Sequence, residues 1–177
     1  MSLPRYTTPA IALHWLLALM ILGTMAFGVY MADLPMSPTR LKLFNYHKWA
    51  GMTILILSAV RLLWRLTHRP PADVPMPAWQ RQVAHGVHLG MYLLFFAVPL
   101  VGWAYSSAAG FQIVLYGVLP LPNWVAPDRA LAEAIKPWHG YLAFALGALV
   151  ILHVAGALKH QFVDRDGLIG RMWPSRT

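Results

Sequence analysis

Four long runs of apolar residues, separated by polar and proline-containing segments, dominate the pattern of the chain. About 20 residues of helix, each rising about 1.5 Å, suffice to cross the hydrocarbon core of a bilayer. Every run is longer than that; they cover residues 10–32, 44–66, 83–106 and 137–160. The pattern predicts an all-α protein: an integral membrane four-helix bundle, forming a single transmembrane domain over residues 1–177.

The last apolar run contains two histidines and, between Pro137 and Lys159, no charged residue. His139 and His153 are 14 residues apart, which on a helix is about 21 Å of rise and places them within about 40° of the same face. An ionisable side chain inside a membrane is costly and therefore indicates a functional site. We expect this helix to offer two ligand nitrogens at two depths.

The first two runs each bring one histidine to the edge of the membrane. His14 lies near the start of the first run and is followed by Trp15, an indole suited to the headgroup boundary. His47 lies in the first turn of the second run, with Gly51 on the same face one turn later. That glycine would leave room for a flat cofactor, or would serve helix packing.

The third run begins with His85 and His88, one turn apart, and contains Pro99, which predicts a kink. Two connections are proline-containing, residues 33–43 and 65–82, and the latter holds His68 as an ordinary loop residue. We expect residues 107–136 to be mixed, with residues 128–136 as a short interfacial helix. The tail, residues 161–177, is polar and basic.

Composition and charge agree with a membrane protein. The chain is 58% hydrophobic and 11% charged, with a mean hydropathy of +0.53. It has no cysteine, which excludes disulfides, thiolate metal sites and covalently attached c-type haem. The net charge of +8 does not indicate nucleic-acid binding, because the basic residues are dispersed between apolar spans.

The distribution of lysine and arginine predicts the orientation in the membrane. With four crossings, one side carries nine basic residues and the opposite side five, and the richer side is expected to be cytoplasmic. Both termini belong to the richer side, so we expect a multi-pass membrane protein with cytoplasmic termini. The nine are Arg5, Arg61, Arg65, Arg69, Arg81, Lys159, Arg165, Arg171 and Arg176; the five are Arg40, Lys42, Lys48, Arg129 and Lys136.

This topology fixes the depth of each histidine and pairs them. His47 should face His139 near the outer surface, and His14 should face His153 near the inner surface. Two facing imidazoles without a thiolate or carboxylate suit the axial ligation of a b-type haem better than zinc or copper. The alternative for each histidine is a hydrogen bond to a neighbouring helix.

Besides the loop residue His68, three further histidines remain outside this ligand set. His85 and His88 lie at the depth of the inner pair, where a spare imidazole can contact a haem propionate or pass protons to a quinone. Of these two roles, a propionate or structural hydrogen bond is the commoner fate. His160, beside Lys159 at the helix end, is expected to be an interfacial residue.

Together these positions resemble the bacterial cytochrome b561 family, and more distantly the cytochrome b subunits of formate dehydrogenases and nickel–iron hydrogenases. The resemblance rests on HW at His14, the histidine at position 47, AHGVHLGMYLLF at residues 84–95, and WHGYLA with a second histidine 14 residues after His139. It implies two haem b groups, held between the first and fourth helices and between the second and fourth. It also implies, for some members, oxidation of periplasmic superoxide to oxygen with ubiquinone as electron acceptor.

The residues leave several functions open beside that one. Superoxide steering would need cations at the outer mouth, and the five basic residues of that side are candidates for anion steering or for propionate contacts; Asp33, Asp128 and Glu133 partly offset them. The second function is a di-haem conduit between a partner redox protein and the quinone pool, and the third is a histidine-lined transporter. Expected partners are membrane lipid, quinone, and superoxide or a periplasmic electron donor, but no nucleic acid.

Overall fold

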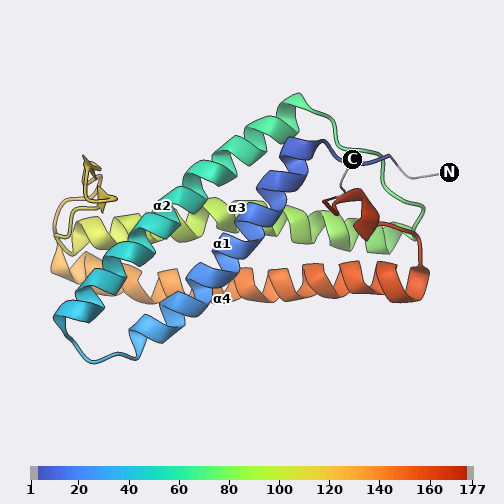
Figure 1. Ribbon diagram of the computed structural model, residues 1–177. Coiled ribbons are helices and arrows are strands. Elements are labelled where there is room, and N and C mark those ends of the chain that lie inside the picture. Colours follow the sequence, from blue (N-terminus) through green and yellow to red (C-terminus); the bar gives the residue numbers. More distant parts are fainter. Residues whose placement is uncertain (1–3, 175–177) are drawn as a thin grey trace.

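The computed structural model describes residues 4–174 and consists mainly of four long helices (Figure 1). Each of the four is long and apolar enough to cross a membrane, so the predicted four-helix membrane bundle is confirmed. A small antiparallel hairpin lies between the third and fourth helices, and two short helical turns follow the fourth. The elements are α1 Thr8–Ala32, α2 Pro38–Thr67, α3 Ala78–Ala108, β1 Val114–Leu115, β2 Leu119–Pro120, α4 Arg129–Lys159, η1 His160–Asp164 and η2 Ile169–Arg171.

The helices form two crossing pairs. α1 and α2 run obliquely across α3 and α4, which lie alongside each other (Figure 1). The main buried core forms where the pairs cross, and it takes side chains from all four helices. On α4 its buried member is Leu146, seven residues from both His139 and His153. An apolar layer therefore separates the two histidine levels of α4 by about 10 Å on either side.

The first three helices extend beyond their predicted limits because proline is tolerated at helix starts. α2 begins at Pro38 instead of residue 44, and the Ser37 hydroxyl accepts a 3.2 Å hydrogen bond from the Arg40 main-chain N–H. α3 begins directly after Pro77, five residues earlier than predicted. Pro99 lies inside α3 and is buried.

The prediction of a separate interfacial helix over residues 128–136 was wrong. These residues form the first turns of α4, which continues through Pro137 without interruption. Asp128 caps the helix by accepting a 3.1 Å hydrogen bond from the Leu131 N–H, and the missing N–H of Pro137 removes only one intrahelical hydrogen bond. The sequence predicted that a new helix begins at Pro137. In the structure, Pro137 lies within one longer helix and costs it a single hydrogen bond.

The hairpin covers α2 at the end of the bundle that contains His47. The Trp49 indole N–H donates a 2.7 Å hydrogen bond to the Val114 carbonyl. Met52 of α2 forms a small buried cluster with Ile113 and Leu115. We call this end of the bundle the hairpin end.

The described parts of both termini meet at the opposite end, which we call the terminal end (Figure 1). The Tyr6 N–H donates to the Arg171 carbonyl at 3.2 Å. The Arg171 side chain is buried and donates to the Pro4 carbonyl at 3.0 Å and to the Ala72 carbonyl at 2.9 Å. Both termini therefore share one side of the bundle, as four crossings require. Arg176, part of the basic count, lies outside the described residues.

Candidate functional site

The structure places the four predicted ligand histidines together in two pairs. At the hairpin end, the rings of His47 from α2 and His139 from α4 have centroids 6.0 Å apart. At the terminal end, the rings of His14 from α1 and His153 from α4 have centroids 6.1 Å apart. α4 contributes one ring to each pair because its two histidines share a face.

The hairpin-end pair contains an imidazole whose tautomer is set by the main chain. His139 Nδ1 lies 3.0 Å from the Val98 carbonyl oxygen. A carbonyl only accepts hydrogen bonds, so in the neutral ring Nδ1 carries the proton and the Nε2 lone pair is free. Histidine ligands of metals are typically oriented by this kind of bond through the other ring nitrogen.

Two glycines from neighbouring helices make room for the hairpin-end rings. A Cβ atom at Gly28 of α1 would lie 3.0 Å from His47 Cε1, and one at Gly102 of α3 would lie 2.9 Å from His139 Cε1. Gly51, which the sequence suggested as room for a flat cofactor, has nothing within 4 Å of such an atom. Close approach to the imidazoles therefore depends on Gly28 and Gly102.

The spacing of both pairs fits a metal held between two imidazoles. With metal–nitrogen bonds of about 2 Å, two axial rings have centres about 6 Å apart. The observed 6.0 and 6.1 Å agree with this separation, and His47 Nδ1 is a buried nitrogen without a hydrogen-bond partner among the described residues. No carboxylate of that part of the chain is hydrogen-bonded to any of the four rings. The donors present therefore suit haem iron better than zinc.

The terminal-end pair has two close neighbours that the hairpin-end pair lacks. His88 from α3 has its ring centroid 5.2 Å from that of His153. Arg61 from α2 places Nη1 3.0 Å from His14 Nδ1, and its Nε donates to the Tyr92 hydroxyl at 3.2 Å. Three imidazoles and a guanidinium thus gather at this level.

The spare histidines on α3 separate in the structure. His88 lies beside the terminal-end pair, as its depth suggested. His85 does not: it is exposed, and its Nε2 lies 3.1 Å from an Asp73 carboxylate oxygen. The one-turn spacing gives the two rings similar depth, but only His88 contacts a paired histidine.

The remaining histidines lie away from the pairs. His68 is exposed and stacks on Trp64 with ring centroids 3.8 Å apart. His160 lies just past the end of α4, where Nδ1 is 2.5 Å from an Asp166 oxygen and 3.3 Å from an Asp164 oxygen. The Lys159 ammonium also bonds Asp164, at 2.6 Å. These contacts hold the start of the tail against the end of α4.

The five basic residues expected on the outer side lie at or near the hairpin end. Arg40 donates to the Ala32 carbonyl at 2.8 Å, whereas Lys42, Arg129 and Lys136 are exposed. Lys48 directly follows His47 in the chain, is half-buried, and places its Nζ 5.5 Å from the centre of the Phe111 ring. Lys48 is thus the member of this group nearest in sequence to a paired histidine.

Sequence reasoning missed the contact between Arg61 and His14, because Arg61 was counted only as a charge of the adjoining loop. A depth count could have found it. His14 lies six residues after the start of α1 at Thr8, and Arg61 lies six residues before the end of α2 at Thr67. Equal depth on neighbouring antiparallel helices brings such residues together.

A membrane bundle whose half-buried histidines face each other in pairs has the architecture of a membrane-bound b-type cytochrome. The chain matches the family described as prokaryotic cytochrome b561 over residues 5–175. It therefore belongs to the prokaryotic cytochrome b561 family, whose members bind b-type haem and transfer electrons in the membrane.

Three relatives have lengths close to that of this chain. It is 33% identical to Cytochrome b561 homolog 2 of Escherichia coli K12, covering 95% of this chain and 90% of the relative. It is 30% identical to Cytochrome b561 homolog 1 of the same organism, covering 97% and 98%. It is 29% identical to a protein of Yersinia pestis named Probable superoxide oxidase CybB, covering 97% of both chains.

Proposed function

We propose that this cytochrome holds two b-type haems, one between His47 and His139 and one between His14 and His153. We further propose that it oxidises superoxide to oxygen and reduces ubiquinone. The observation that carries the proposal is the pair of ring separations, 6.0 and 6.1 Å, at two levels of one helix. The name of the Yersinia pestis relative, a probable superoxide oxidase, supports the choice of substrate.

Each bound haem supplies one-electron exchange through its iron. The chain provides the fixed geometry: α4 sets the distance between the levels, since its histidines are separated by about 21 Å of helix. The Val98 carbonyl orients His139, and the apolar core around Leu146 keeps water from the space between the levels. One level thus faces each side of the membrane.

The proposed reaction balances with two superoxide anions for each quinone. Each anion loses one electron and leaves as oxygen, and one ubiquinone takes up two electrons and two protons. Superoxide is negatively charged, so basic residues at the hairpin end would raise its local concentration. Lys48, half-buried beside His47 in the chain, is the strongest candidate for this role. His88, in contact with His153, is the corresponding candidate for proton delivery to the quinone.

The proposed orientation places the hairpin end in the periplasm and the termini in the cytoplasm of a bacterial inner membrane. The nine-to-five distribution of basic residues supports it, because the rule is strongest for short connections. Superoxide from the periplasm would then meet the hairpin-end pair first.

The experiment is an assay of the purified cytochrome with enzymatically generated superoxide and a soluble ubiquinone analogue. We expect quinone reduction that superoxide dismutase abolishes and that rising ionic strength slows, since the steering is electrostatic. A Lys48→Gln variant should reduce the quinone more slowly than the wild type at low salt. Arg81→Gln, on the opposite side of the bundle, is the control. Haem reduction by superoxide without quinone turnover would contradict the proposal and favour a conduit served by a partner protein. Absence of haem would favour the transporter.

A further inference from the structure

Two arginines of α2 at the terminal end have no acidic partner in the described part of the chain. Arg61 and Arg65 are one turn apart, and neither forms a salt bridge there. Both place the guanidinium carbon near the Tyr92 ring, at 5.9 and 5.8 Å from its centre. Like charges at this helical spacing repel each other. Two cations on one ring therefore mark a place where an anion would be stabilised.

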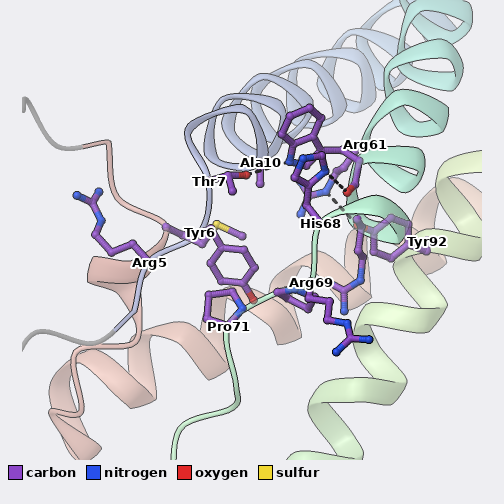
Figure 2. A pocket seen from close by; sticks show the side chains of 13 residues that line it. Arg5, Tyr6, Thr7, Ala10, Arg61, His68, Arg69, Pro71 and Tyr92 are labelled. Atoms are coloured by element: carbon purple, nitrogen blue, oxygen red, sulfur yellow. Dashed lines mark hydrogen bonds between the residues drawn. The ribbon is translucent and has the colours of Figure 1, made fainter.

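The surroundings of these arginines are basic and contain no carboxylate. They line a pocket with Tyr92, Tyr6 and further residues, none of which is Asp or Glu. Figure 2 shows Arg61 close to Tyr92, whereas Arg5 extends away on the other side of Tyr6. Arg61 also contacts a paired histidine directly, through its Nη1 at 3.0 Å from His14 Nδ1.

Arg61 is satisfied here only by uncharged acceptors. Its Nε donates to the Tyr92 hydroxyl, and its Nη1 donates to His14 Nδ1. A guanidinium has donors only, so His14 Nδ1 is the acceptor and the proton of the neutral ring is on Nε2. With Arg61 in this position, His14 has no free lone pair to offer a metal.

The two histidine pairs therefore differ in whether a ring nitrogen is free to bind a metal. The bond from His139 to Val98 leaves the Nε2 lone pair free for a ligand, while in His14 the bond from Arg61 occupies the Nδ1 lone pair and leaves the proton on Nε2. Binding of a haem at His14 requires Arg61 to release Nδ1. A haem also brings two carboxylates, the groups that arginine binds most strongly.

We propose that Arg61 and Arg65, positioned by Tyr92, form the propionate-binding site of the haem between His14 and His153. Arg61 exchanges the His14 nitrogen for a propionate when that haem binds. The assignment rests on the proposed ligation by His14 and His153. It makes Arg61 a positioning residue in the haem-free chain and a direct haem contact in the loaded protein.

The test is a redox titration of the purified cytochrome and its Arg61→Gln, Arg61→Lys and Arg65→Gln variants, with haem content measured in parallel. A cation beside the haem favours the reduced form, so its loss should lower the potential of one haem. We expect Arg61→Gln to disfavour reduction of that haem about tenfold, which is about 59 mV for one electron. Arg61→Lys should shift less, and Arg65→Gln should shift in the same direction.

Control variants show which haem the substitution affects, and they separate the propionate assignment from the proposed ligation. Arg81→Gln, the same change outside the pocket, should leave both potentials unchanged. In a His139→Ala background the Arg61→Gln shift should persist, and in a His14→Ala background it should vanish. Two retained haems with unchanged potentials in Arg61→Gln and Arg65→Gln, or a shift confined to the hairpin-end haem, would overturn the propionate assignment. Failure of His14→Ala to lose a haem would instead refute the underlying ligation.

Discussion

Substituting Gly102 by alanine tests the close packing of the hairpin-end site. The new Cβ atom would lie 2.9 Å from His139 Cε1 and 3.0 Å from Nδ1. Ordinary carbon contacts begin near 3.5 Å, so the ring must retreat by about half an ångström. That movement acts directly on the 3.0 Å hydrogen bond from Nδ1 to the Val98 carbonyl.

The size of the effect follows from the bond that is disturbed. Changing the partner that orients a metal-binding histidine typically costs 10–100-fold in metal affinity. We therefore expect Gly102→Ala to weaken haem binding at the hairpin end by about 10–100-fold. Binding between His14 and His153 should not change, because those rings do not approach Gly102.

The matched control is Gly23→Ala, an alanine for an exposed helical glycine of α1 with nothing within 4 Å of the new atom. Haem content after detergent washing, together with difference spectra of the reduced and oxidised forms, distinguishes the two variants. Gly23→Ala should keep both haems, and Gly102→Ala should lose one preferentially. Equal haem retention in both variants would show that the close approach of α3 to His139 does not control binding.

Three further predictions concern other parts of the chain. Arg171→Ala leaves two main-chain carbonyls without their buried donor and should destabilise the protein by about 1–3 kcal/mol; an unchanged thermal unfolding midpoint relative to Arg81→Ala would contradict this. His88→Ala should keep both haems and their reduction but slow quinone reduction, whereas His85→Ala should reduce quinone at the wild-type rate. Wild-type quinone turnover in both variants would exclude a quinone role for His88. A reporter fused to the C-terminus should be active only in the cytoplasm, and periplasmic activity would invert the orientation.

The helix count and the histidine pairing could be predicted because both depend on spacing along the chain. Residues 14 apart share a helix face whatever surrounds them, and depth in a membrane follows from distance to the helix ends. His139 and His153 therefore contact the histidines that the depth count assigned to them. Whether these rings hold iron remains a prediction that haem binding must test.

Features that depend on how helices cross could not be predicted in the same way. The approach of Gly28 and Gly102 to the imidazoles is set by the packing of α1 and α3 against their neighbours, which no single-chain periodicity reveals. The burial of Arg171 likewise requires the tail to return to the N-terminal segment. At Pro137 the helix continues, although the sequence predicted that a separate helix ends just before this residue.

The most direct test of the central claim is the number of haems per chain in the purified protein and in two variants of α4. Two axial pairs predict a pyridine haemochrome ratio of two in the wild type. The same account predicts a ratio of one in both His139→Ala and His153→Ala. Each variant should retain a different haem, which its spectrum distinguishes. A wild-type ratio of one, or a variant that keeps both haems, would contradict ligation by these pairs.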